Sequence, residues 1–415
     1  MAIVGAGAAG LATAIFARRF NPARSVVLLD GARSPGAKIL VSGGSRCNVT
    51  NAIVTEKDFW GGKPSLIRRA LRAFPVEDTV AFFRDIGVSL HEEPGGKLFP
   101  DTNRARDVLA ALLRESDRSG ATLLPGHRVT DVVRTSPPAP HPSHLFRIST
   151  DRGEMTAGAV VLATGGQALP KSGSDGAGFA IARRLGHRIV PTTPALAPLV
   201  LDPADAMHAA VSGVSHDAEL AVWIDGAVST RLTGSLLWTH FGISGPVALN
   251  ASRHWLRAQL EERRVAMTVS FRPGARFEDA DADWQRRAAS HPRASVQATL
   301  ATMLPGSVAA ALLRILALDG TATLAHVSRD DRRTLSRALV ELPLPVTGSR
   351  GYTFAEATAG GVALDEIDAG TMRSRICPGL SCVGEILDVD GRIGGFNFQW
   401  AWSSGFVAGR ALATG

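Results

Sequence analysis

Three glycines near the start of the chain, Gly5, Gly7 and Gly10, have the spacing of a dinucleotide-binding turn. In such a turn the first glycine permits a tight bend, and the second lets the backbone approach a pyrophosphate. The third lets the helix pack closely on the strand. The N–H groups that follow, including those of Ala8 and Ala9, then face the phosphates from a helix N-terminus. We expect these five residues to bind a dinucleotide.

The elements around this turn support the interpretation. Residues 2–4 are a short apolar strand, residues 11–20 have the pattern of a helix, and residues 25–29 are a second strand that ends at Asp30. A carboxylate about 20 residues after the last glycine accepts hydrogen bonds from ribose hydroxyl groups. The βαβ unit therefore opens a doubly wound sheet. Without this context the glycines would indicate only a turn.

Two distant segments favour FAD over NAD. Residues 160–166 are an apolar strand followed by a small-residue turn, in which Thr164 and Gly165 can approach the dinucleotide. Residues 384–397 contain two glycine-rich turns that lead into a final helix, which we expect to begin near Asn397. The candidate cofactor contacts in these turns are Gly384, Glu385, Asp388, Gly394, Gly395, Phe396 and Asn397; Val129, in a strand expected near 127–134, is a further one.

These segments are similar to those of the glutathione-reductase-like superclass of FAD proteins. The resemblance implies non-covalent FAD, with the last segment along its ribityl chain and flavin ring. More narrowly, the chain resembles the bacterial aminoacetone-oxidase-like, bile-acid-reductase-related flavoproteins, whose FAD domain is split by inserted β-rich and helical subdomains. The stretches that carry this resemblance are 38–51, 96–100, 239–246, 384–391 and 397–405.

The glycine-rich stretch at residues 36–51 has too little periodicity for a helix or strand, so we expect none. It supplies the candidate cofactor residues Lys38, Ser42, Gly43, Arg46, Asn48 and Thr50. The resemblance implies that this loop lies against the isoalloxazine; the alternative is a polar loop that caps helices. The family usually has a third glycine where this chain has Ser45, whose side chain we expect to crowd the cofactor. Cys47 lacks the partner cysteine of disulfide reductases, so we interpret it as a packed residue.

His240 is the candidate catalytic residue. It lies in a Gly/Ser/Pro-rich segment, and as a general acid it would exchange a proton while the flavin exchanges hydride. A histidine bonded to nearby backbone explains the segment equally well. Residues 173–178 resemble a second phosphate loop, but no strand directly precedes them. We therefore expect NAD(P)H, the predicted co-substrate, to bind over the flavin without a second Rossmann domain.

The predicted fold class is α/β, with a Rossmann-like FAD-binding domain split in sequence. We expect its first part at residues 1–190 and its C-terminal part at 359–415. The alternating texture of residues 191–272 predicts a β-rich substrate-side domain, which returns at about 341–358; residues 273–340 have a helical pattern. A proline-rich piece at 136–142 is expected to form a surface turn.

Composition excludes several classes of protein. The net charge of +7 comes from arginines spread along the chain, so we expect no nucleic-acid partner. The three cysteines form no metal-like cluster, and we expect no metal site and a reducing cytoplasm. Because the first strand starts at Ala2, we expect no signal peptide, and the apolar runs are too short to span a membrane. Nothing in the sequence indicates the oligomeric state.

The leading hypothesis is an FAD-dependent oxidoreductase. It would exchange hydride between a small organic substrate, the flavin, and NAD(P)H or oxygen. The resemblance implies either reduction of an activated double bond or oxidation of a small amine. Two other hypotheses remain: a flavin-dependent RNA-modifying protein, and a redox-responsive protein that holds FAD without turnover.

Overall fold

The computed structural model describes residues 1–135, 145–204 and 206–414, so the proline-rich piece expected to form a turn at 136–142 lies outside the described residues. The chain forms two compact units. The first contains Met1–Thr192 and Glu356–Gly415, and the second contains Thr193–Ala355. Each unit has its own hydrophobic core.

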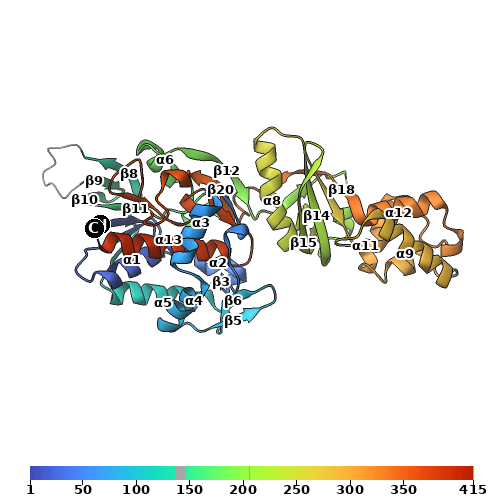
Figure 1. The fold of residues 1–415 in the computed structure, drawn as a ribbon, viewed down its shortest axis with the longest axis horizontal. Coiled ribbons are helices and arrows are strands. Elements are labelled where there is room, and N and C mark those ends of the chain that lie inside the picture. Colours follow the sequence, from blue (N-terminus) through green and yellow to red (C-terminus); the bar gives the residue numbers. More distant parts are fainter. Residues whose placement is uncertain (136–144, 205, 415) are drawn as a thin grey trace. The chain divides into compact units, whose positions relative to one another are not determined.

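A five-stranded parallel sheet is the centre of the first unit (Figure 1). Its inner strands β11 and β1 are fully buried apolar segments, as expected for parallel strands covered on both faces. The strand of this sheet that comes last in the chain pairs with β11, so the sheet is complete only when the C-terminal piece has joined it. This sheet confirms the predicted Rossmann-like α/β fold class. In spatial order its strands are β21 (Leu380–Cys382), β11 (Val160–Leu162), β1 (Ala2–Val4), β2 (Val27–Asp30) and β7 (Thr122–Pro125).

Smaller sheets and several helices surround this centre. The smaller sheets are β3 (Thr50–Asn51) with β6 (Lys97–Pro100) and β5 (Leu90–Glu93); β8 (Val129–Arg134) with β9 (Phe146–Thr150) and β10 (Gly153–Ala157); β4 (Phe59–Gly61) with β22 (Val389–Gly391); and β12 (Ile189–Ala195) with β20 (Ala357–Val362). The helices are α1 (Ala8–Phe20), α2 (Ala37–Ser45), α3 (Pro64–Ala73), α4 (Val76–Asp85), α5 (Ala105–Arg118), α6 (Ala177–Arg184) and α13 (Phe396–Ala413).

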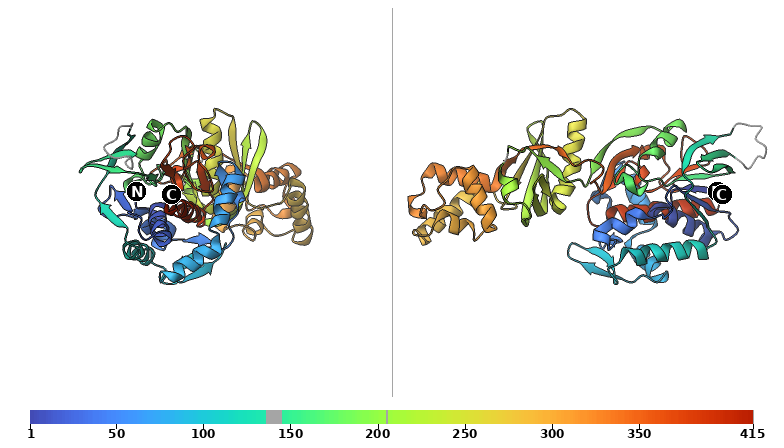
Figure 2. Two further views of the ribbon diagram at one scale, coloured as in Figure 1. Left: turned by 60° about the vertical axis from the view of Figure 1, so that its left-hand side comes forward. Right: turned by 180° about the vertical axis from the view of Figure 1, so that it is seen from behind.

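The first and last helices, α1 and α13, pack side by side (Figure 1). Two glycines on α13, one turn apart, make the close approach possible. A Cβ on Gly405 would lie 2.9 Å from the Ala9 carbonyl oxygen, and one on Gly409 would lie 2.8 Å from that of Thr13. The two chain ends also lie close together, as both views in Figure 2 show. Segments from opposite ends of the sequence therefore build one layer beside the sheet.

A seven-stranded antiparallel sheet is the centre of the second unit. In spatial order its strands are β18 (Leu342–Leu344), β17 (Val265–Ser270), β14 (Ser215–Ile224), β15 (Ala227–Thr239), β16 (Gly242–Ser244), β13 (Leu199–Leu201) and β19 (Val346–Ser349). The helices of the unit are α7 (Ala206–Ala210), α8 (Gly245–Leu260), α9 (Phe277–Ser290), α10 (Val296–Leu300), α11 (Gly306–Ile315) and α12 (Arg329–Glu341).

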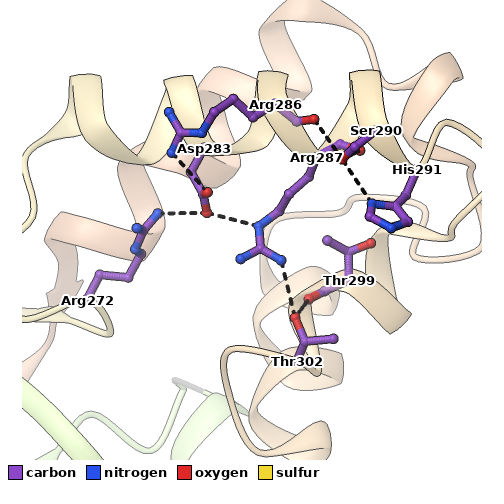
Figure 3. A network of polar contacts seen from close by, with 8 residues as sticks. All are labelled: Arg272, Asp283, Arg286, Arg287, Ser290, His291, Thr299 and Thr302. Carbon is purple, nitrogen blue, oxygen red and sulfur yellow. Dashed lines mark hydrogen bonds and ion pairs between the residues drawn. The ribbon is translucent and has the colours of Figure 1, made fainter.

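The carboxylate of Asp283 accepts hydrogen bonds from three arginines at the start of the helical segment. Asp283 on α9 accepts from Arg287 at 2.9 Å, from Arg286 at 3.1 Å and from Arg272 at 3.3 Å (Figure 3). Arg287 also donates to Thr302, which lies just beyond α10. Burial opposes ionisation of Asp283, but the bond from Arg287 and the charges of Arg287 and Arg272 hold its pKa below the usual range.

One expectation about local structure was wrong. Residues 36–51 do contain regular elements, α2 and β3, because a left-handed Gly36 allows a short helix to begin before the glycines break it at Ser42. The region predicted to be β-rich, residues 191–272, supplies strands β13 to β17 of the antiparallel sheet, and it also contains the 16-residue helix α8. Its buried residues Val247, Ala251 and Trp255 recur at helical spacing, and the preceding strands masked that pattern.

Candidate functional site

The turn after β1 has room only for glycine at two of its three positions. Gly5 has a φ of +103°, and a Cβ there would lie 2.4 Å from the Ala163 carbonyl oxygen. A Cβ on Gly10 would lie 1.9 Å from the Gly5 carbonyl oxygen. At Gly7, by contrast, a Cβ would meet nothing within 4 Å. The protein therefore leaves open space at the glycine whose backbone is expected to approach a pyrophosphate.

The N-terminus of α1 offers donors to an anion. Helical bonding begins with Leu11, whose N–H donates to the Gly7 carbonyl at 2.9 Å, so the N–H groups of Ala8, Ala9 and Gly10 precede the helical ladder. Asp30 lies beside this turn, because one carboxylate oxygen accepts from the Ala6 N–H at 2.7 Å. Each carboxylate oxygen has a second lone pair that a ribose hydroxyl can use.

The turn after β11 packs on the loop at 173–178. A Cβ on Gly178 would lie 1.9 Å from the Thr164 hydroxyl oxygen, and one on the left-handed Gly165 would lie 2.7 Å from the Ser174 hydroxyl oxygen. That Ser174 hydroxyl is buried without a hydrogen-bond partner among the described residues. Val129 is buried at the start of β8.

Gly384 joins the C-terminal piece to the first turn of α1. A Cβ on this left-handed residue would lie 2.7 Å from the Cβ of Ala9. Its N–H donates to the Ser404 hydroxyl at 3.0 Å, and its carbonyl accepts from the Trp400 indole at 3.2 Å. The two expected pieces of a dinucleotide site therefore meet at this point.

Glu385 supplies the best test of whether the site fits FAD. One of its carboxylate oxygens accepts from the Lys38 ammonium at 2.6 Å. The other is buried and has no partner among the described residues. Burying a carboxylate oxygen without a hydrogen-bond donor lowers the stability of the fold. We therefore expect a ligand hydroxyl to donate to this oxygen. The ribityl chain that the resemblance places along this segment carries such hydroxyls, and the residues therefore fit the cofactor.

The loop at 42–51 is fastened to the final helix. The Thr50 hydroxyl donates to Gln399 at 2.6 Å, and the Trp402 indole donates to the Val49 carbonyl at 2.8 Å. The Asn48 amide bonds both the loop and the turn before the final helix. Its nitrogen donates to the Thr50 carbonyl at 2.8 Å, and its oxygen accepts from the Gly395 N–H at 3.1 Å. The predicted residues of this loop and of the last glycine turn thus lie together.

Some predicted cofactor residues have protein partners in the structure. Both carboxylate oxygens of Glu93 accept from the Arg46 guanidinium, which stacks 4.0 Å from the centre of the Phe99 ring. The Asn397 amide bonds both the N–H and the carbonyl of Gly391. The Ser42 hydroxyl donates to the Ile39 carbonyl, and Phe396 is buried. These contacts shape the loops, and direct contacts of these side chains with a cofactor stay predictions.

The remaining predicted residues are placed as follows. Gly43 and Gly394 have positive φ angles, and the Asp388 carbonyl accepts from the Gly62 N–H at 2.8 Å. His240 belongs to the second unit, where it is exposed between β15 and β16 with its ring edge-on to Phe241.

Sequence reasoning missed two buried polar side chains. Gln399 on α13 accepts from Thr50 and donates to the Phe74 carbonyl at 3.0 Å. The Thr358 hydroxyl accepts from the N–H groups of Gln167 and Ala168. The signal for Gln399 was an amide in an otherwise apolar helix; Thr358 gave no signal of its own.

The structure also assembles a serine, a histidine and a glutamate at hydrogen-bond distance. His187 lies 2.9 Å from Glu366 and 2.8 Å from the Ser374 hydroxyl oxygen. That oxygen already accepts from the N–H groups of Ile376 and Cys377 at 3.0 and 2.8 Å. Its lone pairs are therefore used by a turn, and the group is a structural cap instead of a nucleophile.

Cys47 is fully buried, and burial raises the pKa of its thiol to about 12. At neutral pH it is a thiol, which is a poor redox nucleophile. Within the described residues, no group of three His, Cys, Asp or Glu side chains could hold a metal ion. No helix in the part of the chain that the structure describes is long and apolar enough to cross a membrane.

Known proteins are similar to this chain in sequence or in fold. The family model described as HI0933-like protein Rossmann domain matches residues 1–411. The 3-dehydro-bile acid delta(4,6)-reductase of Clostridium scindens is 32% identical over 411 residues, which cover 99% of this chain and 98% of that protein. The ribosomal RNA dihydrouridine synthase of Escherichia coli is 31% identical over 413 residues, covering 99% and 97%.

The crystal structure of 3-ketosteroid delta1-dehydrogenase from Sterolibacterium denitrificans has the same fold. Its TM-score is 0.50 at 14% identity, and the match covers 100% of this chain and 99% of that one.

Proposed function

The chain belongs to the HI0933-like family of FAD-binding Rossmann proteins, and we propose that it is a reductase of carbon–carbon double bonds conjugated to a carbonyl group, with NAD(P)H as the hydride source. Two relatives above 30% identity support this reaction. Their names describe unlike molecules, a 3-oxo bile acid and a uridine in RNA, but in both the reduced bond is activated by a carbonyl.

The buried Glu385 oxygen is the observation that supports a catalytic cofactor site. When bound, FAD supplies hydride transfer in two halves, first from NAD(P)H and then to the substrate. The open N–H groups of α1 would hold the pyrophosphate of FAD, Asp30 would hold the ribose, and Glu385 would accept from a ribityl hydroxyl. The positive dipole end of α13 favours negative charge near its first residues.

An absorption spectrum before and after anaerobic addition of NADPH or NADH tests the proposal. We expect flavin bands that bleach with one nucleotide and return when an α,β-unsaturated ketone is added. Bands that bleach with neither nucleotide would refute the NAD(P)H-linked reductase. Bleaching by an amine instead would establish the oxidase chemistry that the resemblance also implies. Bands that no donor bleaches would indicate a protein that only holds FAD.

A uracil ring in RNA is the second candidate substrate. The relative named ribosomal RNA dihydrouridine synthase and the net charge of +7 favour it. Against it, many arginines are paired with carboxylates, such as Arg188 with Asp365 and Arg263 with Asp225. Binding of ribosomal RNA that weakens steeply with salt would support this candidate. No binding at low salt would exclude it.

A further inference from the structure

Helix α3 of the first unit has a cationic side that the core does not use. The helix packs on α13, and its Ile67 is fully buried in the core of the unit (Figure 1). Arg69 and Arg72 lie three positions apart on the opposite side, where both are exposed. Lys63, also exposed, precedes the helix, and residues 63–74 include no acidic side chain.

The C-terminal piece adds two arginines beside α3. A Cβ on Gly370 would lie 2.4 Å from a guanidinium nitrogen of Arg69, so the turn that holds Gly370 contacts this arginine. Three residues further on, Arg373 donates to the Ala411 carbonyl at 2.7 Å, near the end of α13. Arg410 precedes that residue, and both arginines are exposed. The cations joined in this way, called the basic face below, are Lys63, Arg69, Arg72, Arg373 and Arg410.

The charge of the basic face is not compensated by the protein. Among the described residues, no carboxylate forms an ion pair with any of its side chains. The acidic groups close by belong to other arginines: Arg68 pairs with Glu56 at 2.7 Å, and Arg375 lies 3.8 Å from Asp368. An exposed group of unpaired cations favours an anionic partner with several charges.

An exposed aromatic ring lies next to the basic face. The Arg410 guanidinium carbon is 5.3 Å from the centre of the Phe406 ring, and the Phe20 ring is 5.7 Å from the same centre. Phe20 is 49% exposed, although phenylalanine is mostly buried in proteins. Cations that contact phosphates, with an aromatic ring on which a base can stack, are typical of proteins that bind single-stranded nucleic acid.

The arrangement of α3 argues against a membrane as the partner. An amphipathic helix binds a membrane by inserting its apolar side between the lipids. The apolar side of α3 is buried in the core of the unit, so the helix presents its cations alone. Guanidinium groups form two parallel hydrogen bonds with a phosphate, and several of them match the successive phosphates of a nucleic-acid strand.

We infer that the basic face binds the phosphate backbone of a single-stranded RNA that carries the uracil ring to be reduced. The inference rests on the proposed function, because it selects the second candidate substrate described there. The expectation of no nucleic-acid partner relied on arginines spread along the sequence. The fold, however, brings cations from residues 63–72 and 373–410 to one side of the unit.

RNA binding by the FAD-loaded protein tests the inference. The probe is a short, fluorescein-labelled, uridine-rich single-stranded RNA, and its anisotropy is measured over a range of NaCl concentrations. Each phosphate contact contributes about 0.7 to the slope of log K against log salt for a single strand. We therefore expect R69Q/R72Q to reduce the slope by about 1.4 and to weaken binding roughly 10-fold at physiological salt. R69K/R72K keeps both charges and should retain most of the affinity.

The matched control is R104Q/R263Q, which lowers the net charge equally. It removes two exposed arginines that are paired with carboxylates, Arg104 with Asp107 and Arg263 with Asp225. This control should bind the RNA like the wild type.

Several results would overturn the inference. An unchanged affinity and salt slope in R69Q/R72Q, with a wild-type melting temperature, would mean that the RNA binds elsewhere. A wild type that does not bind the RNA at low salt, or that binds phosphatidylglycerol vesicles instead, would also overturn it. Equal weakening by R104Q/R263Q would replace the basic face with a general effect of net charge.

The proposed function is tested separately, by anaerobic reoxidation of the reduced flavin. Reoxidation by an α,β-unsaturated ketone in a protein that does not bind RNA would overturn the inference and support the proposed function. Flavin that neither the ketone nor the RNA reoxidises would refute the proposed function, even where R69Q/R72Q weakens RNA binding as expected.

Discussion

The Lys38 ammonium lies 2.6 Å from a carboxylate oxygen of Glu385, although 347 positions separate the two residues. The pair connects helix α2 of the N-terminal piece with the turn after β21 of the C-terminal piece. Because Lys38 binds one carboxylate oxygen, the other is held in a buried position without a protein donor. Two segments that the sequence places far apart therefore hold one buried acceptor oxygen, which we propose binds the cofactor.

We expect Glu385→Gln to weaken FAD binding by about 10- to 100-fold, because a hydrogen bond to a charged group contributes about 1.5–3 kcal/mol. Titration of the apoprotein with FAD, followed by flavin fluorescence, measures the change. Asp365→Asn is the control, since Asp365 forms an exposed ion pair with Arg188 in the same unit. An unchanged FAD affinity in Glu385→Gln would remove Glu385 from the site.

Alanine substitutions at two glycines of the first turn should have different effects on apoprotein stability. Gly7 has an ordinary φ of −81° and open space around a Cβ, so Gly7→Ala should change the stability of the apoprotein by less than about 1 kcal/mol. It should still weaken FAD binding by at least about tenfold, because the methyl group fills the pyrophosphate space. Gly10→Ala should lower apoprotein stability by about 3 kcal/mol, because its Cβ overlaps the Gly5 carbonyl. Melting curves with and without FAD distinguish the two; equal effects on the apoprotein would contradict the prediction.

Ser45→Gly should stabilise the protein by up to about 1 kcal/mol. Ser45 is exposed and has a φ of +67°, a conformation that costs a side-chain-bearing residue about 1–2 kcal/mol and glycine much less. The greater freedom of glycine in the unfolded chain offsets part of that gain. Thermal unfolding measures the change in stability. Ser45→Val should lower the stability instead of raising it. A destabilised Ser45→Gly would show that the hydroxyl makes a contribution larger than the backbone strain.

Asp283→Asn should lower stability at pH 7 by about 2 kcal/mol, because three arginines lose their shared carboxylate. The folded protein holds the pKa of Asp283 below its usual range. The carboxylate therefore stabilises the fold above the unfolded pKa, about 3.9, and this stabilisation disappears as the pH falls through the lower folded value.

Urea unfolding at pH 7 and at pH 3 tests this sign. The difference between the wild type and Asp283→Asn should be smaller at pH 3 than at pH 7, because part of the carboxylate's contribution is lost below the unfolded pKa. Glu278→Gln, an exposed change on the same helix, should differ little from the wild type at either pH. A difference that stays constant with pH would mean that Asp283 acts through packing.

The sequence predicted the parts of the fold that depend on local pattern. The glycine turn, the first strand and the final helix were recognised because their spacing has a direct physical purpose. The fold class and the FAD-binding family follow from them and are confirmed. Helix α8 was not predicted, because it lies within a region whose alternating texture is mostly that of strands.

The site was less predictable where it depends on contacts between distant segments. No local pattern shows that Lys38 meets Glu385, that Gln399 receives the Thr50 hydroxyl, or that Asn397 bonds Gly391. Ser45 illustrates the same limit. The sequence showed that Ser45 replaces a glycine of the motif. Only the structure shows that the backbone is left-handed there, which is a conformation that favours glycine.

The pairing of β21 with β11, and of α13 with α1, has a consequence for synthesis on the ribosome. A nascent chain that has reached residue 355 has the glycine turn and the first helix, but it lacks Glu385 and the helix to which the loop at 42–51 is fastened. Such a chain exposes the apolar face that α13 later covers. The residues proposed to bind the cofactor are thus brought together only when the last part of the chain has emerged.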